Sequence, residues 1–161
     1  MLNFFAAALL AATATSAAVP QDDASWVRAE GLSIPAIYPS VKDQPGPLLT
    51  CNSGKYGLII STRDGDFDSI IDSSSNRTRN MSGSIEVDGE ETYKGFFSYR
   101  PGTGAASAVE RKPAAQVFNA VVRGQSVDFR LGRKVETTLS LPPMDDTFRT
   151  FAAECKAQTT A

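Results

Sequence analysis

The sequence contains no histidine among its 161 residues. This absence excludes Ser-His-Asp and Cys-His catalytic arrangements, histidine-ligated metal sites and the commonest general base of enzymes. A glycine-rich phosphate-binding loop and an S-x-x-K nucleophile motif are also missing. A carboxylate pair is the remaining route to hydrolysis, because two Asp or Glu side chains can converge from distant positions.

The chain also has little net charge. Its 16 Lys and Arg residues and 18 Asp and Glu residues give a formal charge of −2 at pH 7. So small a charge does not steer partners strongly, and its sign is unfavourable for nucleic acid. The basic residues are scattered along the chain, which is typical of a solvated surface. We therefore expect no nucleic-acid partner, and the lack of cofactor motifs predicts that no cofactor is needed.

Long apolar runs are absent beyond the N-terminus. Residues 4–12 form a short apolar run, and small residues follow at positions 13–18. A membrane-spanning helix needs roughly 20 apolar residues, so we expect no transmembrane segment. The pattern is typical of a secretory signal peptide over residues 1–18, although no Lys or Arg precedes the run. Export predicts a periplasmic or secreted chain; a buried N-terminal helix is the alternative.

Cysteine is scarce, with only Cys51 and Cys155 in the chain. Two cysteines in an exported chain predict one disulfide. It would close a loop of roughly 100 residues, for which the chain-entropy model gives about 4.7 kcal/mol. Two free thiols are the alternative. A catalytic thiol is disfavoured, because the sequence has no C-x-x-C motif and no histidine to activate a thiolate.

The C-terminal stretch has the pattern of an amphipathic helix. Phe148, Phe151, Ala152 and Cys155 follow the spacing i, i+3, i+4 and i+7, which places them on one helix face. Asp145 is the predicted N-cap of this helix. The sequence therefore predicts a helix that packs through its phenylalanines and is linked to the start of the domain by the Cys51–Cys155 disulfide.

A second helix is predicted in the middle of the chain. Its apolar face consists of Ala114, Val117, Phe118 and Val121, at i, i+3, i+4 and i+7. Pro113 suits the first helical position and Gly124 suits the C-terminal cap. Most other regular segments read as strands. The expected strands are Trp26 to Ile34, Tyr56 to Thr62, Phe67 to Ile71, Ser84 to Val87, Thr92 to Arg100, Val127 to Leu131 and Val135 to Leu141.

These elements predict a mainly β fold in one domain: an antiparallel β-sandwich with one or two short helices. Residues 19–47 are expected to be an extended N-terminal segment with an edge strand, because four prolines interrupt its second half. Residues 48–156 would form the sandwich, and residues 157–161 a tail. Residues 101–107, rich in Gly and Ala, are expected to be a flexible loop.

Two polar stretches are weak candidates for ligand or modification sites. Asp64, Asp66 and Asp68 alternate as in a calcium-binding loop, but the glycine and glutamate of an EF-hand are missing, which favours a solvated turn. Asn76 and Asn80 each begin an N-x-Ser/Thr motif. These motifs would accept glycans in a secreted eukaryotic protein and carry no meaning in a typical bacterium.

Aromatic residues cluster in the Thr92 to Arg100 strand. Strand alternation places Tyr93, Phe97 and Tyr99 on one face and Phe96 on the other. Core packing is the favoured interpretation of the first three. The alternative is a surface that presents these three aromatics to a partner.

The order of the elements resembles that of a family of small exported proteins. Its parts are Leu49-Thr50-Cys51 ahead of a strand, Val87-Asp88-Gly89 in mid-chain, a helix from Ala114 to Val122, the strand pair that follows it, and the closing helix from Phe148 to Cys155. The layout is similar to the invasion-associated locus B family and to periplasmic accessory proteins of type VI secretion, over about residues 48–156. The resemblance implies a non-enzymatic envelope or secreted protein whose partner is unknown.

We therefore expect an exported binding or accessory protein that acts through a surface. The alternatives are a carboxylate glycoside hydrolase that acts on a polysaccharide, and an inhibitor that inserts a loop such as residues 101–107 into an enzyme. Two facing carboxylates about 5–9 Å apart in a cleft would favour the hydrolase.

Overall fold

The computed structural model describes residues 24–41, 43–63, 65–72 and 77–159. The expected signal peptide, Asp64 of the aspartate turn and the Asn76 glycan acceptor all lie outside the described residues. Asn80 is described, and its side chain is exposed.

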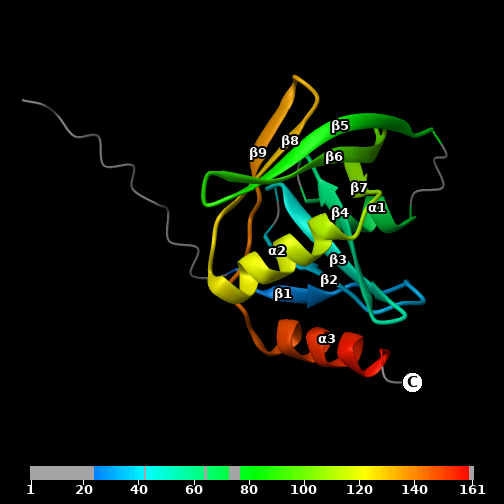
Figure 1. Ribbon diagram of the computed structural model, residues 1–161. Coiled ribbons are helices and arrows are strands. Elements are labelled where there is room, and N and C mark those ends of the chain that lie inside the picture. The colour runs from blue at the N-terminus through cyan, green and yellow to red at the C-terminus, as the bar shows by residue number, and fades with distance from the viewer. Residues whose placement is uncertain (1–23, 42, 64, 73–76, 160–161) are drawn as a thin grey trace, which may run out of the picture.

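Nine antiparallel strands form one continuous sheet in the order β1-β2-β3-β4-β7-β6-β5-β8-β9 (Figure 1). The strands are β1 (Trp26–Arg28), β2 (Ala36–Pro39), β3 (Gly46–Asn52), β4 (Lys55–Ser61), β5 (Arg79–Val87), β6 (Glu90–Arg100), β7 (Ala105–Ala108), β8 (Val127–Leu131) and β9 (Val135–Thr138). The predicted antiparallel, mainly β architecture is confirmed. The sheet curls into a half-barrel, however, and does not split into the two facing sheets of a sandwich.

The reason for the single sheet is β7, which joins its two halves. Ala106 pairs with Ile60 of β4 on one side and with Tyr99 of β6 on the other. Ala105 and Ala106 are fully buried. The prediction of a flexible loop over residues 101–107 was therefore wrong for its second half, and the turn between β6 and β7 is limited to residues 101–104.

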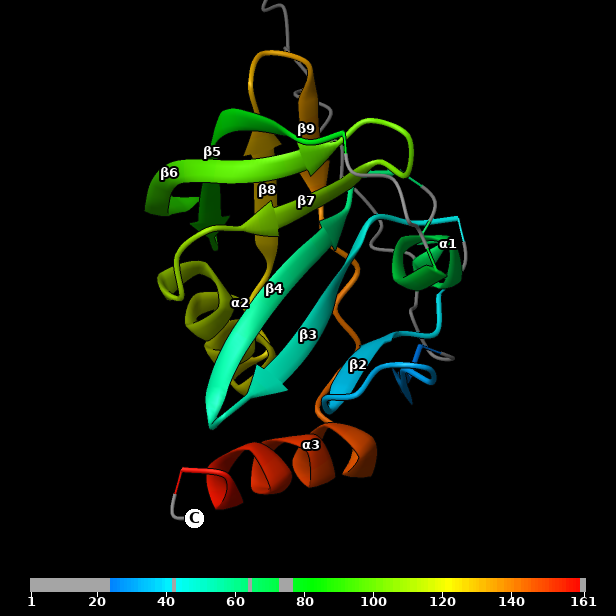
Figure 2. The same ribbon diagram turned by 90° about the vertical axis from the view of Figure 1, so that its right-hand side faces the viewer.

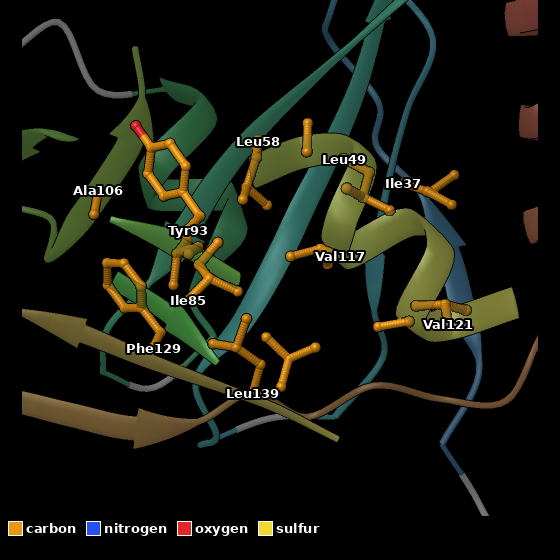
Figure 3. Close-up of a cluster of buried hydrophobic side chains, with 14 of the residues drawn as sticks. Ile37, Leu49, Leu58, Ile85, Tyr93, Ala106, Val117, Val121, Phe129 and Leu139 are labelled. Atoms are coloured by element: carbon orange, nitrogen blue, oxygen red, sulfur yellow. The ribbon is translucent and has the colours of Figure 1, made fainter. Parts of the chain in front are cut away.

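Helix α2 (Lys112–Arg123) fills the concave side of the curled sheet, as Figure 2 shows. Its residues Val117 and Val121 belong to one buried cluster with strand residues such as Leu49 and Ile85 (Figure 3). Gly124 ends the helix in the left-handed conformation, with φ of 65° and its N–H donating to the Val121 carbonyl. The predicted helix and its cap are confirmed.

Helix α3 (Asp146–Ala157) packs across one end of the sheet beside β1 and β2. The Asp145 side chain accepts a hydrogen bond from the Phe148 N–H, as an N-cap should. Phe148 and Phe151 are fully buried, and the Trp26 ring lies 5.2 Å from the Phe148 ring. The predicted helix, its cap and its apolar face are all confirmed.

Helix α1 (Phe67–Asp72) lies on the opposite, outer face of the sheet, where a short strand was expected. Asp66 favours the helix because its carboxylate accepts a hydrogen bond from the Ser69 N–H in the first turn. Phe67 and Ile70, at i and i+3, then face the sheet together and pack in a second core with Leu48.

The proline-rich part of residues 19–47 contains β2, which the sequence did not predict. Pro39 is the last residue of this strand, so the three residues before it keep their N–H groups for the sheet. Strand β1, at the edge of the sheet, is much shorter than the expected strand over Trp26 to Ile34. None of α1, α2 and α3 is long and apolar enough to cross a membrane, and the search covered only the described residues.

Candidate binding surfaces

The disulfide joins Cys51 of β3 to Cys155 of α3, with the two Cα atoms 5.6 Å apart. Both cysteines are almost completely buried. Nearby, the Gln158 side chain accepts a hydrogen bond from the Gly54 N–H at 3.2 Å and so adds a second link between α3 and the β3–β4 turn. The predicted pairing is confirmed. Because the disulfide is buried, it is a structural link between α3 and the sheet.

The aspartate turn caps α1. Asp66 accepts hydrogen bonds from both the N–H and the hydroxyl of Ser69, and these bonds lower the pKa of the Asp66 carboxyl. Asp68 is exposed in the first turn of the helix, where a negative charge is favourable. Within the described residues, no group of three or more His, Cys, Asp or Glu side chains is placed to hold a metal ion.

A hollow of about 510 Å³ lies beside this turn. Tyr38, Asp43, Asp66 and Asp68 contribute to its walls, and the Tyr38 ring stacks on Phe67 at 4.8 Å. Burial raises the pKa of the Tyr38 hydroxyl, with a smaller contribution from the negative charge of Asp68. A glycosidase needs a carboxylic acid whose pKa is raised. The shift at Asp66 has the opposite direction, so Asp66 is poorly suited to act as a general acid.

The aromatic candidates Tyr93 and Phe97 lie in the core, and Tyr99 packs partly buried against it. Phe97 is fully buried, with its ring 5.0 Å from that of Phe129. The side chains of Tyr93 and Phe97 therefore do not form an accessible interface in this structure. The core-packing interpretation matches the geometry, because this face of β6 is the concave face that α2 covers.

The exposed aromatic of β6 is Phe96, on the outer face of the sheet. Its side chain is 62% exposed, and that of Val109 is 64% exposed. The β6–β7 register ends at the pair of Phe97 and Ala108, and Val109 follows in a bend directly after β7. Phe96 and Val109 are thus two exposed apolar residues beside the end of this strand pairing. We call these two residues the Phe96 patch.

Polar side chains surround the Phe96 patch. Ser82 of β5 is directly opposite Phe96, and Lys94 and Ser98 are its neighbours on the same face of β6. Strand alternation already placed Phe96 away from the other aromatics. The contribution of Val109 was not recognisable from the sequence, because Val109 directly follows the unexpected strand β7.

Two other features complete the surface. On the outer face of β5, β8 and β9, Arg130 forms ion pairs with Glu86 at 2.6 Å and Glu136 at 2.9 Å.

A hollow of about 520 Å³ lies beyond the C-terminal end of α2, between Gln125 and Pro142. Its described walls carry no Asp, Glu, Lys, Arg or Tyr side chain, so they offer no titratable group for proton transfer.

A comparison with protein-family models, with curated proteins and with solved structures finds no match for this chain.

Proposed function

We propose that this chain is an exported, non-enzymatic binding protein, and that it recognises a partner protein of the bacterial envelope or secreted fraction through the Phe96 patch. The observation that carries the proposal is the exposed Phe96 side chain, which has serine and lysine neighbours on the outer face of β6, together with the exposed Val109 directly after β7. Aromatic residues with a polar rim are typical of the energetic centres of protein interfaces.

The backbone of Phe96 is fixed by a neighbouring strand. Phe96 pairs with Ser82 of β5, whereas β7 pairs with β6 only from Phe97 to Arg100. The patch rests on a paired sheet with a packed core beneath it, and Phe96 is therefore held by rigid backbone. Such preorganisation reduces the entropy lost when a partner binds.

The alternative of a carboxylate hydrolase requires a carboxylic acid with a raised pKa. In the acidic hollow, hydrogen bonds from Ser69 lower the pKa of Asp66, which disfavours Asp66 in that role. Export rests on the N-terminal sequence pattern, and the buried disulfide is consistent with an oxidising compartment. The mass of the chain recovered from the periplasm or the medium tests removal of residues 1–18.

The test is capture of a partner by matched variants. The disulfide-intact chain, Phe96→Ser and Val122→Ser are immobilised in equal amounts and exposed to envelope and culture-supernatant fractions. Val122 is a suitable control, because its side chain is 47% exposed on α2, away from the Phe96 patch. The proposal predicts one stoichiometric partner that the wild-type chain and Val122→Ser retain and Phe96→Ser loses by at least tenfold in affinity. Equal capture by all three chains would contradict it.

A further inference from the structure

A separate apolar hollow lies on the outer face of the sheet, next to α1. It encloses about 280 Å³. Leu48 of β3 and Ile70 of α1 contribute buried surface, and Ile34 and Ile59 contribute partly exposed surface. This volume is just below the usual range of about 300–1,000 Å³ for small-molecule sites, so it suits a short ligand.

Arg100 is the only charged residue among the described walls of this hollow. Strand alternation places it on the outer face of β6, because Phe97 and Tyr99 face inward. Its partner in the register is Ala105 of β7, which is fully buried in the second core with Leu48 and Ile70. Arg100 has no ion pair and no side-chain hydrogen bond within the part of the chain that the structure describes.

A partly buried guanidinium beside an apolar wall favours an anion that carries hydrocarbon. A carboxylate can accept two parallel hydrogen bonds from a guanidinium, and such charge-assisted pairs are among the stronger polar contacts in proteins. The apolar walls meanwhile gain from covering an aliphatic chain.

The backbone around the hollow favours a hydrocarbon chain over a peptide. At the wall residues Thr50 and Ile59 both edges of the strand are occupied, since Thr50 pairs with β2 and β4 and Ile59 with β3 and β7. An extended peptide therefore finds no free strand edge at these two positions. A peptide backbone in the hollow would leave its own polar groups without partners, at a cost in free energy. An alkyl chain has no such groups.

We propose that this hollow binds a medium-chain aliphatic carboxylate, with its alkyl chain between α1 and the outer face of β3 and β4 and its carboxylate on Arg100. The ligand class is a free fatty acid of roughly six to ten carbons, given the size of the hollow. The site is independent of the Phe96 patch, and its occupation would change the shape of the outer face near α1.

Isothermal titration of the disulfide-intact chain tests this site. The ligands are hexanoate, octanoate and decanoate, with octanamide as the neutral analogue. Arg100→Gln removes the charge and Arg100→Lys restores it. Arg63→Gln is the matched control, because Arg63 donates a hydrogen bond to the nearby Pro101 carbonyl and does not contribute to the walls. Ile34→Gln alters the apolar wall without touching the charge.

The proposal predicts saturable, one-to-one binding of octanoate. Along the series of carboxylates, affinity should rise by roughly 15-fold for every two added methylenes until the hollow is full. Arg100→Gln should weaken octanoate by roughly ten- to hundredfold and leave octanamide unchanged. Arg100→Lys should restore part of the loss, Arg63→Gln should have no effect, and Ile34→Gln should weaken both ligands.

Four results would overturn the proposal. The first is no saturable binding of any of the three carboxylates. The second is equal binding of octanoate and octanamide to the wild-type chain. The third is a loss with Arg63→Gln as large as that with Arg100→Gln, which would indicate attraction to general positive charge. Loss of binding with Phe96→Ser would also place the ligand elsewhere on the sheet.

Discussion

The Asp145 carboxylate accepts a hydrogen bond from the backbone N–H of Trp26 at 2.8 Å. Its other oxygen accepts from the Phe148 N–H at 2.9 Å, which caps α3. One side chain therefore links the first described strand to the start of the last helix, across 119 positions of sequence. At the far end of α3 the Cys51–Cys155 bond links the helix to β3. The helix is thus held to the sheet at both ends.

Replacing Asp145 by Ala should destabilise the fold strongly. The variant loses the N-cap, worth about 1 kcal/mol, and leaves the Trp26 N–H without its charged acceptor, at a further cost of about 1–3 kcal/mol. We expect a total loss of about 2–4 kcal/mol in the free energy of unfolding, measured by urea titration. Asp146→Ala is the control, because the Asp146 side chain is 99% exposed and its ion pair with Arg149 lies on the surface. An equally stable Asp145→Ala variant would show that α3 does not depend on this link.

Removing the disulfide should lower stability without changing the packed core. We expect the double variant Cys51→Ala/Cys155→Ala to lose about 2–5 kcal/mol in the free energy of unfolding. Since both cysteines are buried, a thiol reductant should cleave the bond in the wild-type chain only as fast as the chain unfolds. The measurement is thiol labelling over time at increasing urea concentrations. Rapid reduction in the absence of urea would contradict the buried position of the bond.

Gly95 of β6 should not tolerate a side chain. A Cβ at this position would collide with the buried Tyr93 ring, which lies over the glycine. We expect Gly95→Ala to cost about 1–3 kcal/mol, as overpacking of a core does. Gly102→Ala is the matched control, because a Cβ there meets no atom within 4 Å. Similar thermal midpoints for the two variants would show that Tyr93 can move aside freely.

Acid should weaken the β5–β6 turn through Asp88. Hydrogen bonds from the Ser126 N–H and the Gln125 side chain lower the pKa of the Asp88 carboxyl in the folded chain. In the unfolded chain the Asp88 carboxyl has its ordinary pKa of about 3.9, so it takes up a proton at a higher pH than in the folded chain. The contribution of Asp88 to stability is therefore fully present above the unfolded pKa. It disappears as the pH falls through the lower pKa of the folded chain.

The test of this linkage is the pH dependence of the Asp88→Asn variant. Asparagine tolerates the left-handed backbone at this turn, where φ is 51°, so the turn itself should persist. We expect the free energy of unfolding of the variant to fall less than that of the wild-type chain between pH 5 and pH 2. Parallel pH profiles for the two chains would show that Asp88 does not titrate with folding.

The helices α2 and α3 were predictable because their signals are local. Proline at the start and glycine at the end frame α2, and Asp145 precedes the phenylalanine face of α3. Helix α1 was mistaken for a strand, because its six residues are too few to show a helical period. The deciding contact, between Phe67 and the outer face of β3, is a tertiary one.

The curled sheet was less predictable because it depends on β7. The sequence Ala-Ala-Ser-Ala has low β-propensity and resembles a loop. In the fold its small side chains suit a position fully enclosed between β4 and β6. Without β7 the remaining strands suggest two separate sheets. The hollow at Arg100 shares this dependence, since Arg100 pairs with Ala105 of β7. Val109 of the Phe96 patch directly follows β7.

The most direct test of recognition through the Phe96 patch is site-specific photo-crosslinking in the producing cell. A benzoylphenylalanine replaces Phe96 in one chain and Val122 in another, and the cross-linked products are compared by mass. The account predicts one discrete cross-linked partner from position 96 and none from position 122. Products of the same mass and yield from both positions, or none from position 96, would contradict it.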